Sequence, residues 1–158
     1  MQPVNSILVP TDFSANSKHA LAYAIQLADR FGASLHVIHV LDDSFALGGY
    51  LEMYAGDYME AANRHAAVQL EALLTPEQKA RYSAVVVVRN GKPATEILAY
   101  IAEHHDIGLV VMATTGRGSV ARFMMGSVTD KVVRAAPCPV LTLHPNDRVE
   151  EQAPNRAA

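Results

Sequence analysis

Two glycines and a serine mark the stretch of this sequence that could hold a phosphate group. Gly116 and Gly126 are separated by nine residues, and Ser127 follows Gly126 directly. An apolar run over 107–113 predicts a buried strand before the first glycine, and a helical pattern begins near Ser127. The start of a helix offers unpaired N–H groups and the positive end of the helix dipole, and glycine lets the main chain approach a ligand closely. We therefore expect an anion-binding loop here.

Two well-known nucleotide-binding patterns do not describe this stretch. Residues 116–121 match G-x-G-x-x-A, but no acidic residue follows at the distance of about 20 positions that ribose binding requires. A Walker A loop needs Gly-Lys followed by Ser or Thr, whereas Ser127 follows Gly126 with no lysine between them. Dinucleotide binding is therefore disfavoured, and the Walker A loop is absent from this stretch.

Strands and helices alternate along the chain, and this alternation positions the loop. It predicts the α/β fold class, with a doubly wound sheet of five parallel strands and helices on both faces. The order that we expect for the strands is third, second, first, fourth, fifth. The first helix is expected to be capped by Ser14 or Asn16 and to end at Gly32, and 44–57 is expected to be a loop. The expected strands are 6–9, 34–41, 84–88, 107–113 and 140–143, and the expected later helices are 58–74, 94–103 and 127–135.

The order of the strands predicts where a ligand would bind. In such sheets the site lies beyond the carboxyl ends of the strands, where neighbouring strands send their connections to opposite faces. If the fourth strand lies beside the first, this crevice is bounded by 10–12 and 112–116. Asp12 then has two interpretations, as a turn carboxylate beside Ser14 or as an acceptor for a ribose or base. Its place in the crevice favours the second.

Nearly the whole chain, from Asn5 to His144, resembles the universal stress proteins, in the branch that binds ATP. The ATP-binding members resemble the pattern G-x2-G-x9-G followed by Ser or Thr, and Ala113 stands where that pattern has its first glycine. The likeness implies a Rossmann-like fold of the adenine nucleotide alpha hydrolase type. It is carried by VPTDFS at 9–14, HVLD at 39–42, GKPATEI at 91–97, MATTGRG at 112–118, GSVTDKVV at 126–133 and APCPVLTL at 136–143.

The resemblance also implies a ligand and its contacts. The ligand is ATP, accompanied by Mg²⁺. Met112 and Ala113 lie at the edge of the implied site, and Ala113 is tolerable there if it ends a strand without a positive φ. By resemblance, Pro10, Thr11 and Asp12 line the adenosine side, Val40 contacts the adenine, and Gly116, Gly126, Ser127 and Val128 hold the phosphates.

Several other polar residues receive structural interpretations. Arg117 and Arg122 are interpreted as solvated loop charges in preference to phosphate ligands. His39 is interpreted as a hydrogen-bonded residue at a strand end, and His104 with His105 as an exposed helix end. Cys138, between two prolines, is interpreted as a small buried residue. We name no catalytic residue, and the metal ligands stay undetermined.

The resemblance implies an ATP-binding protein of stress response or signalling that regulates a partner, and the residues of the site predict at most slow hydrolysis. Phosphoryl transfer needs a placed base and usually Mg²⁺ ligands, and Asp12 is the carboxylate that we can nominate. One alternative is a slow ATPase or autophosphorylating enzyme that uses Asp12 with Mg²⁺. The other is a dimeric interaction module with a decayed nucleotide pocket, which Ala113 favours.

Bulk properties limit the other possibilities. A net charge of −3 and a pI near 6.1 give no basic footprint for nucleic acid, and no run approaches the roughly 20 apolar residues of a membrane span. The first five residues lack the features of a signal peptide, so we expect a cytoplasmic protein.

We expect one domain over 1–144, a disordered tail over 145–158, and a homodimer formed through the uncharged outer strand Val140, Leu141, Thr142 and Leu143.

Overall fold

The central sheet is parallel throughout and has the order predicted from the sequence. The computed structural model describes residues 3–43, 52–114 and 126–144. Its five strands lie in the order β3-β2-β1-β4-β5, so β4 lies directly beside β1. The strands are β1 (Ser6–Pro10), β2 (Ser34–Leu41), β3 (Val85–Asn90), β4 (Ile107–Ala113) and β5 (Val140–Leu143).

Helices connect the strands and cover both faces of the sheet. Ser14 caps the first helix and Gly32 ends it in the left-handed conformation, with φ 65°, as its position after the helical pattern predicts. Among the described residues, no helix is long and apolar enough to span a membrane. The helices are α1 (Ala15–Phe31), α2 (Glu52–Glu71), α3 (Pro76–Arg81), α4 (Pro93–Glu103) and α5 (Ser127–Ala135).

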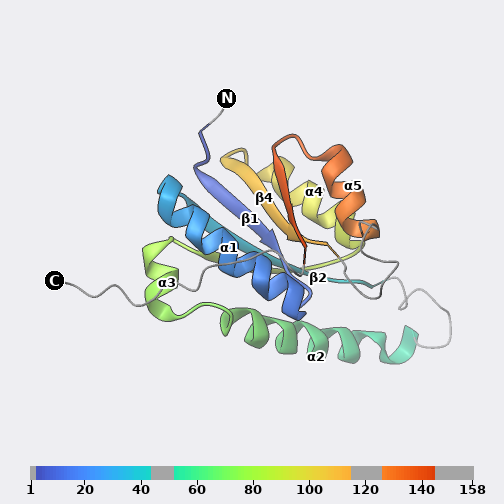
Figure 1. The fold of residues 1–158 in the computed structure, drawn as a ribbon. Helices are drawn as coiled ribbons and strands as arrows, with labels where there is room; N and C mark the ends of the chain where they lie inside the picture. The colour runs from blue at the N-terminus through green and yellow to red at the C-terminus, as the bar shows by residue number, and fades with distance from the viewer. Residues whose placement is uncertain (1–2, 44–51, 115–125, 145–158) are drawn as a thin grey trace.

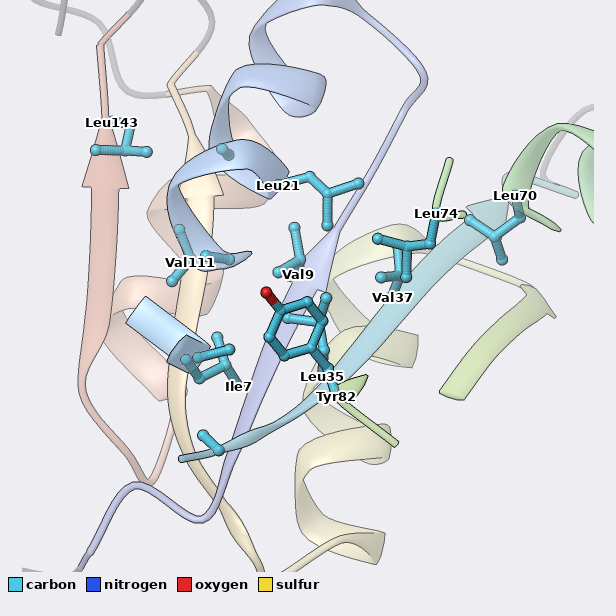
Figure 2. Packing of buried hydrophobic residues seen from close by; sticks show 14 residues of the cluster. Ile7, Val9, Leu21, Leu35, Val37, Leu70, Leu74, Tyr82, Val111 and Leu143 are labelled. Atoms are coloured by element: carbon cyan, nitrogen blue, oxygen red, sulfur yellow. The ribbon is translucent and has the colours of Figure 1, made fainter. Parts of the chain in front are cut away.

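The central strands β2, β1 and β4 are largely buried on both faces because each face of the sheet has its own apolar layer. On one face, Ile7, Val9 and Leu35 pack under α1 and α2 (Figure 2). On the other face, Leu8 and Ile38 pack with residues of α4 and α5, and Figure 1 shows these two helices together on the side of the sheet away from α1. The continuous apolar strands of the sequence reflect this double coverage.

Two expectations for the middle of the chain are wrong. Residues 52–57 belong to α2 and not to a loop, because strong helix formers surround Gly56 and outweigh its cost of about 1 kcal/mol. The sequence also did not predict α3. This helix of six residues has no buried side chain, and its sequence therefore has no apolar period. Its start is nevertheless marked by a capping box in which Thr75 and Gln78 satisfy each other's backbone N–H groups.

The connections after β1 and β4 diverge as expected for a binding crevice. The chain leaves β1 for α1 on one face of the sheet, and after β4 it reaches α5 on the other face. The carboxyl ends of β1 and β4 therefore form the switch point of the sheet. The expected tail over 145–158, and the predictions for Gly116, Arg117 and Arg122, lie outside the described residues.

Candidate functional site

A cavity of about 390 Å³ opens at the carboxyl ends of β1, β2 and β4. Its volume falls in the range of roughly 300–1,000 Å³ that is usual for small-molecule sites. Of the residues predicted from the sequence to form the site, Gly116 lies outside the described part of the chain. The other predicted residues all line the cavity: Pro10, Thr11, Asp12, Val40, Met112, Ala113, Gly126, Ser127 and Val128.

The cavity has further lining residues that the sequence reading missed. Ile38 could have been found, because it lies two positions before Val40 and strand residues alternate between faces. Pro93 and Ile97 come from the start of α4, whose place beside the cavity follows only from the folded sheet. The missed lining residues are Ser14, Asn16, Ser17, Ile38, His39, Pro93, Ile97, Thr114 and Thr129.

The start of α5 presents backbone donors to the cavity. Its N-cap is Gly126, with φ −58° and ψ 150°, and no side chain of the described residues caps the helix. The first helical bond joins Asp130 N to Gly126 O, so the N–H groups of Ser127 to Thr129 have no acceptor within the helix. These donors and the helix dipole suit an anion.

The start of α1 reaches the same cavity but is closed by its own residues. Ser14 has nearly the same backbone geometry as Gly126, with φ −65° and ψ 162°, and its side chain accepts from Ser17 N at 3.2 Å. Ser17 Oγ in turn donates to Ser14 O. The two helix starts therefore differ in one respect that matters for binding: α1 has a side-chain cap and α5 has none.

Asp12 is held in the turn between β1 and α1. Its Oδ1 accepts from Ser14 N at 3.0 Å, so the turn-carboxylate interpretation is correct. Burial would raise the pKa of Asp12, but hydrogen bonds from Ser14 and Ser17 outweigh it and lower the pKa below its usual value. An ionised carboxylate has about four acceptor positions, so this bond leaves it able to accept from a ligand as well.

Ala113 fits its position without backbone strain. It is the last residue of β4, and among the described non-glycine residues the positive φ values are those of Phe13 and Ser83. Its carbonyl accepts from Thr129 Oγ1 at 3.2 Å, which ties the end of β4 to the first turn of α5. Alanine in place of the first motif glycine therefore introduces no backbone strain at this position.

Histidines at the two ends of the sheet are engaged in hydrogen bonds. His39 Nδ1 lies 2.7 Å from Thr11 O, as expected for a hydrogen-bonded strand-end histidine. His105 is exposed, as expected for a helix end. The same expectation is wrong for His104, which is half-buried because its ring stacks on Tyr100, with ring centroids 3.9 Å apart. Cys138 is half-buried rather than fully buried, and burial raises the pKa of its thiol.

The cavity combines apolar and polar walls. One wall is apolar and could pack against a flat ring. It is formed by Ile38, Val40, Pro93, Ile97 and Met112. Among the described residues, no group of three or more His, Cys, Asp or Glu side chains could hold a metal ion. The arrangement can therefore bind a ligand with an apolar ring, hydroxyl groups near Asp12 and an anion at α5.

Comparison with known proteins finds one family over most of the chain. The sequence profile of the Universal stress protein family matches residues 3–144. A universal stress protein of Methanocaldococcus jannaschii is 34% identical over 144 residues, which cover 87% of this chain and 80% of that protein. The structure of UspA from Lactobacillus plantarum is 28% identical with a TM-score of 0.75, covering 90% of this chain and 99% of that one.

A further solved relative has been determined with a bound nucleotide. It is a universal stress protein in complex with cAMP, 22% identical with a TM-score of 0.57, and the match covers 90% of this chain and 98% of that one. At this identity the likeness concerns the fold alone.

Proposed function

Because the chain belongs to the universal stress protein family, we propose that its cavity binds ATP and that the nucleotide state regulates a partner in a cytoplasmic stress or signalling response. One observation carries the proposal. An apolar wall, an ionised carboxylate and an uncapped helix start face the same cavity of about 390 Å³. Adenine, ribose and phosphate need these three environments in turn.

The adenosine half of ATP is assigned to the β1 and β2 side of the cavity. Val40 and Met112 provide apolar contact for the adenine, and Pro10 and Thr11 bound the same region. Asp12 accepts from the ribose hydroxyls, which an ionised carboxylate does more strongly than a neutral group. A protein of this fold has been solved in complex with cAMP, which is itself an adenine nucleotide.

The phosphates are assigned to the start of α5. The phosphates accept hydrogen bonds from the N–H groups of Ser127 and Val128 and approach the backbone at Gly126. Gly116, which lies outside the described residues, is a further proposed contact. The negative charge of Asp12 disfavours phosphate near the turn after β1. Attraction at α5 and repulsion at Asp12 therefore set one orientation for the nucleotide.

We expect Mg²⁺ to arrive with the triphosphate. This ion keeps several waters and binds through the phosphate oxygens. Asp12, which lines the cavity, is assigned to the ribose, and we assign the ion no side-chain ligand. His39 is assigned to the Thr11 carbonyl through Nδ1 and Asp12 to the ribose, so we name no general base. Turnover should lie far below the ~10 per second of an ordinary enzyme. Phosphate release near that rate would favour the ATPase alternative.

Isothermal titration of nucleotide-free protein with ATP, with and without Mg²⁺, tests the proposal. Gly126→Val should weaken binding by at least about tenfold, equivalent to about 1.4 kcal/mol, because its side chain obstructs the phosphate position. The fold should survive, since the φ of Gly126 is negative. Gly56→Val is the matched control, because nothing lies within 4 Å of a Cβ added there. An absence of heat or thermal shift at millimolar ATP in the wild type would contradict the proposal and favour a decayed pocket.

We further propose that the protein forms a homodimer through β5. This strand is at the edge of the sheet, and Val140, Leu141, Thr142 and Leu143 carry no charge that would discourage pairing. A two-fold axis would pair two such edges antiparallel. Light scattering should give a dimer at tens of micromolar, and Leu141→Pro or the milder Thr142→Lys should give a folded monomer. A monomeric wild type would contradict the dimer, and dimeric variants would place the interface elsewhere.

A further inference from the structure

The turn that carries Asp12 has a backbone shape that needs support. Phe13 has φ 63°, in the left-handed region that residues other than glycine seldom adopt. Within the turn, Phe13 N donates to Thr11 Oγ1 at 3.1 Å and Ser14 N donates to Asp12 Oδ1 at 3.0 Å. Because the carboxylate is itself one of these acceptors, its position depends on the shape of the turn.

His39 supports this turn from the end of β2. A carbonyl oxygen can only accept, so His39 Nδ1 carries the proton and donates to Thr11 O at 2.7 Å. The same ring lies against Phe13, with centroids 4.3 Å apart and planes tilted by 36°. One side chain thus contacts both neighbours of Asp12 in the sequence.

The base of the turn is also fixed to β2 through the backbone. Thr11 N donates to Ile38 O at 2.8 Å, next to His39 in the chain. Thr11 is therefore held at its N–H by the strand and at its carbonyl by the imidazole. Loss of the imidazole would release the carbonyl and the Phe13 ring while leaving the strand pairing of Thr11 in place.

We infer that His39 is a positioning residue for ribose recognition, acting by holding the turn so that the Asp12 carboxylate meets the ribose hydroxyls of the nucleotide. The inference rests on the proposed function, since it concerns how the same cavity selects its ligand. His39 acts through Asp12 in this account, and its loss affects ligands that bear ribose hydroxyls more than ligands that lack them.

The ratio of two dissociation constants isolates this role. ATP and 2′,3′-dideoxy-ATP share the base and the triphosphate and differ in the hydroxyls that Asp12 would accept from. The wild type should prefer ATP by about tenfold, as expected for a hydrogen bond to a charged group. Asp12→Ala should bring the ratio close to one, which verifies that the ratio reports the carboxylate.

Three histidine variants complete the experiment, each measured by titration calorimetry and by thermal unfolding. His39→Leu removes the donor and should reduce the preference for ATP to about twofold or less, mainly by weakening ATP. His39→Asn places an amide donor near the position of Nδ1 and should restore most of the preference. His105→Leu changes an exposed histidine outside the cavity lining and should leave the ratio at the wild-type value.

Each outcome decides between distinct accounts. Equal weakening of both ligands in His39→Leu, or an unchanged ratio, would overturn the positioning role. A wild type that binds ATP without preferring it would overturn the inference while leaving the proposed function intact. Binding of neither ligand by the wild type would instead overturn the proposed function.

Discussion

Polar side chains gather at both ends of the sheet, and those at the carboxyl ends line a cavity. At the carboxyl ends, Asp12 and the first turn of α5 line a space of about 390 Å³. At the amino ends, Ser6, Ser34, His36, Tyr100, His104 and Asp106 form an amino-end cluster in which polar groups pair with one another.

The amino-end cluster shows what satisfied polar groups look like in this fold. His36, only 7% exposed, has its Nδ1 2.8 Å from the Tyr100 hydroxyl. Ser6 Oγ donates to Asp106 and lies 2.6 Å from Ser34 Oγ. Because these groups complete each other's hydrogen bonds, the cluster contributes to stability and fold specificity, whereas the uncapped start of α5 leaves donors for a ligand.

The largest expected effect on stability tests the amino-end cluster. Tyr100→Phe leaves the buried His36 Nδ1 without its partner and should lower the free energy of unfolding by about 1–3 kcal/mol. ATP affinity should be unchanged, because Tyr100 does not line the cavity. Chemical denaturation and titration calorimetry measure the two effects. Weakened ATP binding in the folded variant would mean that the two ends of the sheet are coupled.

A smaller effect should follow pH. Burial lowers the pKa of His36 in the folded protein below its ordinary value of about 6.5, with Asp106 opposing and His104 adding to the shift. The unfolded chain therefore binds more protons, so stability is complete above about pH 6.5 and declines as pH falls toward the folded-state pKa. Thermal unfolding at about pH 7.5 and 5.5 should show this decline. His36→Asn should lessen it, and an equal decline in the variant would place the titration elsewhere.

The smallest expected effect on stability tests the difference between the capped start of α1 and the uncapped start of α5. Gly126 has the backbone geometry of a helix cap without the side chain, so Gly126→Asp should cap α5 and raise stability by a few tenths of a kcal/mol. The same carboxylate would occupy and repel the phosphate position, so ATP binding should be lost. Thermal unfolding measures the gain in stability of this variant, and titration with ATP measures its loss of binding. A variant that binds ATP normally would mean that the phosphates lie away from α5.

Much of the fold could be predicted because its signals are local. The apolar runs at 34–41, 107–113 and 140–143 end at polar or proline residues, and the strands have those bounds. The parallel arrangement followed from the alternation of strands with helices and from a right-handed crossover. The position of the fourth strand beside the first was an assumption, which the pairing of β1 with β4 confirms. By contrast, α3 buries no side chain, so it lacked the periodic pattern on which helix prediction depends.

The site was predictable in part for the same reason. The residues after β1 and β4 that line the cavity belong to local motifs, which can be recognised in the sequence. Pro93 and Ile97 reach the cavity only because α4 packs on the sheet, which no local motif indicates. The bond from His39 to Thr11 joins residues 28 positions apart. No spacing in the sequence indicates such a contact, because it depends on the register of β2 against β1.

The difference between the two ends of the sheet can be tested most directly by following backbone amide resonances while ATP and Mg²⁺ are added to isotope-labelled, nucleotide-free protein. Saturable shifts should concentrate at Thr11, Asp12, Val40 and the first turn of α5. The amides of Ser6, Ser34 and Asp106 should remain unchanged. Shifts concentrated in the amino-end cluster, or none anywhere at millimolar ATP, would contradict the account.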